Sequence, residues 1–323
     1  MIEVTAPMEA QSAPALPAGA GWWFEPKWDG FRCLAFKDGG EVRLRAKSGR
    51  PLGRYFPEVL AALAAFAENS FVIDGELLIE AGGAFSFEAL QMRLHPAESR
   101  IRRLAGETPA GLTAFDMLLS PAGKDLRPRP LSERRAALEA MMAKDHPPSL
   151  SITPGTADRR LAQAWLDEGR LEGVIAKRLD RPYLEGARAM VKVKRIRTAD
   201  CVVGGFRYAA AGGVAGSLLL GLYDAAGRLN HVGFTSGLAA VDKAALTRRL
   251  EALRGEPGFT GDKPGGPSRW ATERSAAWTP LRPELVVEVS FDHVSAGRFR
   301  HGTRLIRFRP DKAPAQCRMD QIA

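Results

Sequence analysis

Alternating apolar and polar residues predict a series of short strands in the first part of the chain. Strands are expected at Trp22–Pro26, Phe31–Lys37, Glu41–Ala46, Phe71–Ile79, Leu112–Leu118 and Gly173–Lys177, and the run Asp38-Gly39-Gly40 is a hairpin turn signal. Apolar residues at helical spacing predict helices at Leu60–Ala67, Phe87–Leu94 and Ser132–Lys144. Residues 1–20 are rich in Ala and Pro, and we expect a loosely ordered lead-in there. Strands mixed with helices at these spacings favour an α/β or α+β body over a helical bundle, and we expect the α+β class.

The pattern changes after residue 197, where glycines separate short strands. Strands are expected at Cys201–Phe206, Ser217–Tyr223, Leu229–Phe234, Leu285–Phe291 and Thr303–Arg309, with a helix at Ala239–Arg254 and a surface loop at Gly255–Ser268. Closely spaced short strands of this kind are typical of a small β-barrel. We therefore expect one domain at residues 1–197 and a second at residues 198–323.

Composition and charge add a preferred class of partner. The chain has 323 residues, enough for two domains with separate cores, and its 45% apolar and 26% charged residues are ordinary for a globular protein. Its net charge of +9 favours a polyanionic partner, and the segment from residue 198 is the more basic, with +5 against +4 before it. The widely spaced Cys33, Cys201 and Cys317 argue against a zinc site or a disulfide framework. No apolar run approaches the roughly 18 residues that span a bilayer, so a cytoplasmic protein without membrane contact is expected.

Candidate chemistry begins with the run Glu25-Pro26-Lys27-Trp28-Asp29-Gly30-Phe31-Arg32. This run fits a lysine nucleophile that carries a nucleotide. An amine that normally titrates near ~10.4 must be neutral to attack phosphorus, which cationic neighbours, a bound metal and a triphosphate could promote. On an extended strand Asp29 is expected to face the same side as Lys27, and Gly30 would let the backbone turn beneath a ligand. Taken alone, the run leaves a solvated surface lysine open as the alternative.

The run from Glu25 to Arg32 resembles motif I of the covalent nucleotidyltransferases. Further segments resemble the other motifs of this family, in the same order along the chain. They contain Lys47 followed by Phe56-Pro57-Glu58, Asp74-Gly75-Glu76, Phe115, Glu172 with Gly173 and Lys177, Lys192 with Lys194, and Arg309 with Lys312. The resemblance implies that the nucleotide is bound by Glu25, Lys27, Asp29, Arg32, Lys47, Glu76, Phe115, Glu172, Lys192, Lys194, Arg309 and Lys312.

The resemblance also implies individual roles within this set. Lys47 stands where the family usually has Arg and would contact a phosphate as a point charge. Glu76 and Glu172 would lie beside a metal ion, because hard divalent cations select oxygen ligands. Phe115 would stack on adenine, although an aromatic residue in an apolar run more often belongs to the core. Lys192 and Lys194 would reach the α-phosphate, and Arg309 and Lys312 would orient the leaving pyrophosphate.

The stretch Ser295–Arg304 narrows the resemblance to small bacterial ATP-dependent DNA ligases of the ligase C type, relatives of the ligase module of ligase D. That resemblance implies an ATP-grasp-like adenylation domain followed by an OB-fold barrel. It implies an enzyme that uses ATP with Mg²⁺ or Mn²⁺, forms AMP on Lys27, and seals 5′-phosphate/3′-hydroxyl nicks in DNA repair. Nicked or gapped duplex DNA is the expected partner of a monomer, with a separate repair polymerase or end-joining proteins as further partners.

Two other functions stay open at this point. A GTP- or ATP-using RNA capping or RNA-joining enzyme would share the lysine motif and the barrel. A non-catalytic nucleic-acid-binding module would keep the fold without turnover.

Only 26 residues precede Lys27, so we expect no amino-terminal DNA-binding domain and a ligase of two domains. Its barrel would close first on ATP and then on DNA, through a hinge near Lys194–Asp200.

Overall fold

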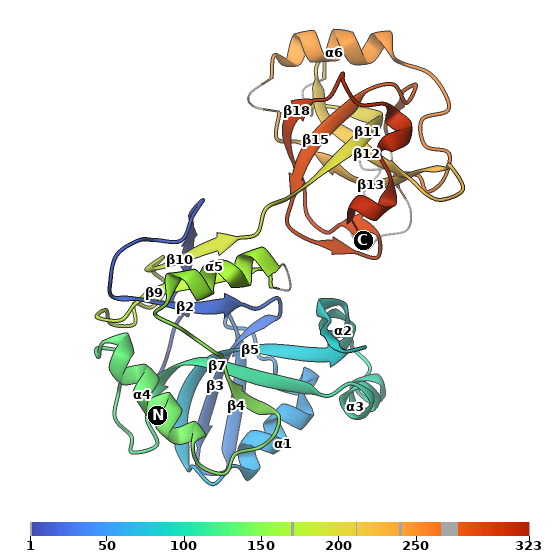
Figure 1. The fold of residues 1–323 in the computed structure, drawn as a ribbon. Coiled ribbons are helices and arrows are strands. Elements are labelled where there is room, and N and C mark those ends of the chain that lie inside the picture. The colour runs from blue at the N-terminus through green and yellow to red at the C-terminus, as the bar shows by residue number, and fades with distance from the viewer. Residues whose placement is uncertain (1, 169–170, 211, 239–240, 266–276, 323) are drawn as a thin grey trace. The chain divides into compact units, whose positions relative to one another are not determined.

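The chain divides into two compact units, and each is described by itself (Figure 1). The N-terminal unit is Met1–Arg195 and the C-terminal unit is Ile196–Ala323. The computed structural model describes residues 2–168, 171–210, 212–238, 241–265 and 277–322. None of the helices in these ranges has the length and apolar content needed to cross a bilayer.

Two sheets form the framework of the N-terminal unit. The first has the strand order β1-β10-β9-β2, built from Ala10–Ser12, Met190–Lys194, Gly173–Arg178 and Trp22–Lys27. The second has the order β4-β3-β5-β7-β8, built from Glu41–Ala46, Phe31–Asp38, Ser70–Ala81, Ala110–Leu119 and Leu150–Ile152, and β6 (Ala84–Phe85) pairs with β5. The chain leaves the first sheet at Lys27 and enters the second at Phe31, so residues 28–30 connect the two sheets.

Helices lie beside both sheets (Figure 1), and apolar residues of several of them belong to the buried clusters of these sheets. α5 (Arg159–Glu168) contacts the first sheet, where Ala162 and Leu166 belong to one buried cluster with strand residues. α1 (Pro57–Ala65) and α4 (Leu131–Met142) contribute to the core beside the second sheet, and α2 (Phe87–Arg93), α3 (Glu98–Glu107) and a 3-10 turn at Gly53–Tyr55 complete the unit. The first helical residue of α1 is Pro57, whose fixed φ and missing N–H suit that position.

Two buried cations tie α1 to its surroundings. The fully buried guanidinium of Arg93 donates two hydrogen bonds of 2.7 Å to Glu58, which also accepts one from the Ala110 amide at 2.9 Å. The Lys37 ammonium donates to the carbonyls of Leu63, Ala64 and Phe66 at the end of the helix, where carbonyls lack helical partners. Glu58 in the Phe56-Pro57-Glu58 segment is therefore a structural residue.

The first residues of the chain are ordered into the N-terminal unit, contrary to the expected loose lead-in. Val4 is fully buried, Met8 and Leu16 are almost so, and Ala10–Ser12 form β1. β1 pairs in parallel with β10, in the register Ala10 to Met190. The expectation was wrong because a strand of three residues whose partner lies so far along the chain leaves no local pattern.

The C-terminal unit is built mainly from antiparallel strands. Its main sheet has the order β13-β12-β11-β15-β18, from Leu229–Thr235, Ala215–Tyr223, Arg197–Tyr208, Val286–Phe291 and Arg304–Phe308. β14 (Thr279–Pro280) pairs with β11, and β16 (Val294–Ser295) pairs with β17 (Arg298–Phe299). Within the described residues this path does not close into a barrel, although an isolated bridge between Thr235 and Thr303 links its two ends.

One helix and two short turns complete the C-terminal unit. α6 (Lys243–Ala252) begins after Asp242, whose carboxylate accepts from the amides of Ala244 and Ala245 as an N-cap. The helix expected from Ala239 is shorter, and its first two predicted residues lie outside the described ranges. Residues 266–268 of the predicted loop also lie outside them. The 3-10 turns are Pro314–Gln316 and Met319–Ile322.

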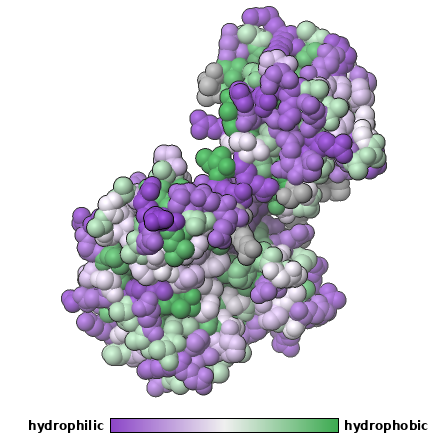
Figure 2. All heavy atoms as spheres, in the orientation of Figure 1, coloured by the Kyte–Doolittle hydropathy of each residue, from purple (hydrophilic) through white to green (hydrophobic). Residues whose placement is uncertain are grey.

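Figure 2 shows a mostly hydrophilic face on each unit, with apolar side chains in small separate groups.

Candidate active site

Three neighbouring strands bring the lysines of the first sheet together. β9 lies between β2 and β10, so Gly173 pairs with Lys27 on one side and with Lys194 on the other. The preceding residue, Glu172, contacts both lysines: one carboxylate oxygen accepts from Lys27 Nζ, and the other lies 2.9 Å from Lys194 Nζ. A Cβ on Gly173 would lie 2.2 Å from the carbonyl oxygen of Val193, so glycine permits this approach of β9 to β10.

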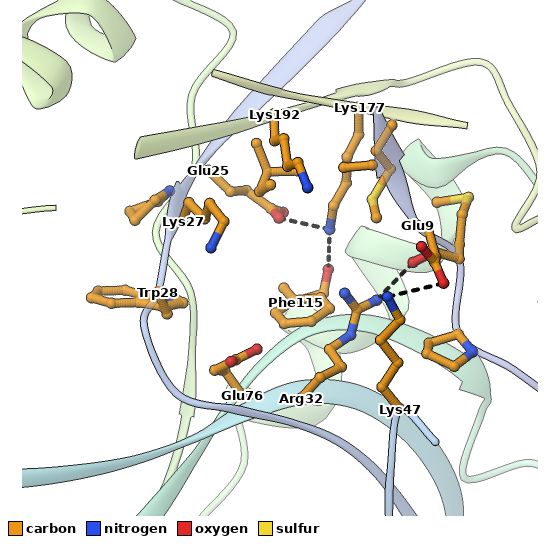
Figure 3. Close-up of a pocket in the computed structure, with 16 residues that line it drawn as sticks. Glu9, Glu25, Lys27, Trp28, Arg32, Lys47, Glu76, Phe115, Lys177 and Lys192 are labelled. Carbon is orange, nitrogen blue, oxygen red and sulfur yellow. Dashed lines mark hydrogen bonds and ion pairs between the residues drawn. The ribbon is translucent and has the colours of Figure 1, made fainter. Parts of the chain in front are cut away.

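A pocket of about 230 Å³ lies beside these strands and is lined by both sheets (Figure 3). The first sheet and the N-terminal segment contribute Pro7, Met8, Glu9, Ala10, Glu25, Pro26, Lys27, Ile175, Lys177, Met190 and Lys192, and the second sheet and its connections contribute Trp28, Arg32, Lys47, Glu76 and Phe115. Most of the residues predicted from the N-terminal motifs therefore meet in one cavity. Its polar lining is mainly cationic, which suits a phosphorylated ligand.

Phe115 reaches this pocket because β7 contains a bulge. Ala114 pairs with Gly75 and Asp116 with Asp74, which leaves Phe115 as the extra residue, and a bulge redirects such a side chain. Phe115 is partly exposed, and its ring centroid lies 4.5 Å from the guanidinium carbon of Arg32. The aromatic ring therefore lines the cavity and is not a core residue.

Two buried ion pairs hold the cations around Phe115. Asp74 accepts from Arg32 Nε at 2.5 Å and from a terminal nitrogen at 2.6 Å, and although burial opposes the charge, Asp74 raises the pKa of Arg32. Glu25 lies 2.6 Å from Lys177 Nζ, which donates to the Phe115 carbonyl at 3.2 Å (Figure 3). Burial raises the pKa of the Glu25 carboxyl, and Lys177 opposes that shift. Glu25 therefore positions Lys177, for which the sequence had suggested no role beyond its place in the motif.

Glu76 and Lys192 face the pocket without an ion pair to another described residue. Burial raises the pKa of Glu76 to about 7, against the opposing charges of Arg32 and Lys27. Burial also lowers the pKa of Lys192, and the ammonium groups of Lys194, Lys27 and Lys47 add to the shift. The pocket thus combines one carboxyl with a raised pKa and one ammonium that has no ion-pair partner among the described residues.

Comparisons with known proteins identify the family. The family model described as the ATP dependent DNA ligase domain matches residues 7–194, and that of the ATP dependent DNA ligase C terminal region matches residues 211–312. The chain belongs to the ATP-dependent DNA ligase family. The ligase is 44% identical to DNA ligase C2 of Mycolicibacterium smegmatis and 42% identical to DNA ligase C of Mycobacterium tuberculosis, each over 98% of this chain and 93% of the relative.

A solved structure supports the same assignment. Mycobacterial DNA ligase D, determined in complex with ATP and MES, is 31% identical to the ligase, with a TM-score of 0.52 and 97% of each chain covered. The expected resemblance to the ligase C type and to ligase D is therefore confirmed. The two parts of the fold correspond to the nucleotidyltransferase domain and the C-terminal domain of this family.

Lys47 and Asp29 differ in how closely they approach the pocket of the ligase. Lys47 follows β4, is 57% exposed, and lies 3.0 Å from a carboxylate oxygen of Glu9 at the pocket wall (Figure 3). Asp29 was expected to share a strand face with Lys27, but it does not, and it does not line the cavity. The expectation was wrong because β2 ends at Lys27, and Asp29 lies in the connection to the second sheet.

The basic pair near the end of the ligase is anchored within the C-terminal unit. Asp200 accepts from Arg309 at 2.9 Å and from Lys312 at 2.6 Å through its two carboxylate oxygens. Arg309 also contacts Asp311 at 2.8 Å, so the aspartate between the two cations holds one of them. Sequence reasoning did not assign Asp200 a role, because its partners follow more than 100 residues later.

Proposed function

We propose that this ligase transfers AMP from ATP to Lys27 and then seals 5′-phosphate/3′-hydroxyl nicks in duplex DNA. The observation that carries the proposal is the junction of β2, β9 and β10, where the Lys27 amine lies at the pocket beside Lys192, Lys194 and Glu172. The ATP complex of the related DNA ligase D supports ATP as the nucleotide.

In the first step, Lys27 Nζ bonds to the α-phosphorus of ATP. The bond from that phosphorus to the oxygen bridging to the β-phosphate breaks, and pyrophosphate leaves. The lysine must first lose a proton, and the Glu172 carboxylate that contacts it is a candidate acceptor. Lys192, which has no ion-pair partner among the described residues, would stabilise charge on the α-phosphate together with Lys194.

Base and phosphate recognition would divide between the pocket walls. Phe115 offers a partly exposed ring on which adenine can stack, with Arg32 and Lys177 held beside it. Lys47 would exchange its contact with Glu9 for a phosphate oxygen. Glu25 would contact the edge of the base and would also hold Lys177 beside it. Asp29 would contact the nucleotide from the connection that follows Lys27.

The carboxylates Glu76 and Glu172 fit a divalent cation. Both are oxygen donors near Lys27, which matches the preference of Mg²⁺ and Mn²⁺, and Glu76 is a carboxyl with a raised pKa and no ion pair among the described residues. When bound there, such a cation would neutralise phosphate charge during transfer.

The later steps would use DNA and the C-terminal unit. AMP would move from Lys27 to the 5′-phosphate of the nick, and the 3′-hydroxyl would displace AMP as the phosphodiester forms. Arg309 and Lys312, held by Asp200, would orient pyrophosphate in the first step. The net positive charge and the OB-type fold that we infer for this unit support a DNA-binding role in the sealing step, with DNA repair as the setting.

Incubation with labelled ATP and Mg²⁺ tests the proposal directly. The wild-type chain is expected to form an acid-labile phosphoramidate on Lys27, and Lys27→Ala and Lys27→Arg are expected to form none, because neither supplies a neutral amine. Lys124→Ala, at an exposed turn outside the pocket, is the matched control and should charge normally. Substantial labelling of the Lys27 variants would place the nucleophile elsewhere, and preference for GTP or for nicked RNA would favour the RNA-joining alternative.

A further inference from the structure

We propose that residues 2–12, called here the N-terminal strap, form a functional wall of the nucleotide pocket, and that Tyr183 is the positioning residue that joins this strap to Arg32. The inference rests on the proposed function, because it assigns the pocket to ATP. Neither the strap nor Tyr183 belongs to the motifs through which the sequence resembles a ligase.

A closed ring of hydrogen bonds connects the strap to the pocket. Tyr183 donates its hydroxyl proton to Asp74 at 2.6 Å and accepts from the Met8 amide at 2.9 Å. Asp74 binds Arg32 through both carboxylate oxygens, and Arg32 donates in turn to the Met8 carbonyl at 3.2 Å. Each of the four residues therefore contacts the next, and Met8 closes the ring with its backbone.

The two hydrogen bonds of Tyr183 are buried, which makes them costly to lose, whereas those of Arg32 are partly buried. Asp74 is fully buried and Tyr183 is 5% exposed. Burial and the neighbouring Asp74 raise the pKa of Tyr183, so its hydroxyl remains a donor at neutral pH. Removing that hydroxyl would leave the Met8 amide without its acceptor and Asp74 with one donor fewer. Arg32 would then be held less firmly beside Phe115.

The strap itself is attached on both sides of Met8. Val4 and Met8 pack in one apolar cluster with Tyr183 and Met190. The Glu9 amide donates to the Ala187 carbonyl at 2.8 Å, and the Met190 amide donates to the Glu9 carbonyl at 3.1 Å. Pro7, Met8, Glu9 and Ala10 all line the pocket. A displacement of the strap would therefore open one wall of the nucleotide site and disturb the strand that carries Lys192.

Tyr183 does not line the pocket, so its effect must pass through Arg32 and Met8. Loss of its hydroxyl should therefore weaken ATP binding more than it slows transfer from bound ATP. In Tyr183→Phe we expect the KM for ATP in lysyl-AMP formation to rise about tenfold, while the rate at saturating ATP stays within about threefold. Tyr55→Phe, which alters a tyrosine outside the pocket lining, is the matched control and should leave both unchanged.

Two further measurements separate positioning from general destabilisation. Hydrogen exchange at the Met8 amide should become about tenfold faster in Tyr183→Phe, because that amide donates to the lost oxygen. In Arg32→Lys, which loses the two-pronged contact with Asp74, adding Tyr183→Phe should raise the KM for ATP by less than it does in the wild type.

The outcomes distinguish failure of this inference from failure of the proposed function. If the wild type charges with ATP but Tyr183→Phe changes neither the KM nor the exchange at Met8, the inference is overturned. A parallel loss of melting temperature and of the saturating rate would make Tyr183 a structural residue and would also refute the positioning role. If the wild type forms no lysyl-AMP, the proposed function fails, and Met8 exchange alone then decides whether Tyr183 holds the strap.

Discussion

At the scale of single residues, the pocket separates charges that are paired by protein from groups that are left for a ligand. Glu25 with Lys177 is a buried pair, and removing one partner would leave an uncompensated charge at a cost of about 3–5 kcal/mol, whereas in the pair of Arg32 with Asp74 only the carboxylate is buried. Glu76 and Lys192 lack such a partner among the described residues, and they face the same cavity as the Phe115 ring, which Arg32 and Lys177 contact. These three residues are therefore the most informative places to test recognition without breaking the fold.

Phe115→Ala should weaken ATP binding by roughly 1–3 kcal/mol, because a base would lose the ring on which it stacks. Phe115→Trp should retain most of the affinity, since it offers a larger face. Titration of ATP against each purified variant measures the effect, with the melting temperature as a control for folding. If Phe115→Ala unfolds but any folded fraction binds ATP normally, the residue serves packing and not recognition.

Glu76 gives a prediction for the dependence of stability on pH. Its pKa is raised to about 7 in the folded chain, so the folded state binds the proton more tightly than the unfolded state. The resulting stability is fully present below about pH 4.5 and is lost as the pH rises through about 7. In the presence of a chelator, Glu76→Gln should therefore gain about 2–3 kcal/mol relative to wild type between pH 5 and pH 8, measured by denaturant unfolding. An equal pH response of the two proteins would show that Glu76 ionises freely.

At the scale of secondary-structure elements, the position of β9 between β2 and β10 makes the site. The residues of three motifs far apart in sequence become neighbours because their strands pair in one sheet, with Gly173 opposite Lys27 and Lys194. The close approach of the Val193 carbonyl to Gly173 makes this junction sensitive to a single methyl group. The distance between Lys27 and Lys194 thus depends on how closely β2, β9 and β10 are spaced.

Gly173→Ala should slow lysyl-AMP formation by at least about tenfold, because the added Cβ would force β9 and β10 apart and move Glu172 away from its two lysines. Gly106→Ala is the matched control: Gly106 lies in α3, a Cβ there would meet no atom within 4 Å, and alanine favours a helix. Single-turnover charging of both variants provides the measurement. Normal charging by Gly173→Ala would mean that the sheet absorbs the methyl group without moving the site.

The sequence predicted these elements where local patterns specify them. The hairpin at Asp38-Gly39-Gly40 and the apolar strand around Asp74 were predicted because turn residues and alternation mark them directly. β1, α3 and α5 were not predicted, since β1 depends on a distant partner and the two helices are short and largely polar. For the site, motif order located Lys27, Glu172 and Lys192, whereas Asp74, Tyr183 and Asp200 act through contacts that only the folded chain creates.

At the scale of the whole molecule, the residues that we propose for nucleotide transfer lie in both units. The nucleotide pocket and the candidate nucleophile belong to the N-terminal unit, whereas Arg309 and Lys312 belong to the C-terminal unit. Asp200 holds both cations from β11, the first strand of its own unit. A role in orienting pyrophosphate would be confined to the first of the three steps, so charging and sealing should respond differently to changes in this pair.

Arg309→Ala and Lys312→Ala should slow lysyl-AMP formation strongly, while single-turnover sealing of a pre-adenylated nick changes little. Asp311→Asn should have a weaker effect of the same kind, because it loosens only Arg309. Lys263→Ala, at an exposed position of the same unit, is the control for general loss of positive charge. Variants that charge normally but fail to seal pre-adenylated DNA would assign the pair to DNA binding and contradict the role in ATP use.

The burial of Lys37 has a practical consequence for chemical modification of this protein. Its ammonium is enclosed by three carbonyls at the end of α1 and is 2% exposed, so an acylating reagent cannot reach it in the native fold. Exposed amines such as Lys47 would react early, and acylation of Lys37 requires local opening of α1 against β3. In a timed acylation followed by mass spectrometry, the rate of Lys37 modification would therefore report local opening of the N-terminal unit. This measurement does not depend on catalytic activity.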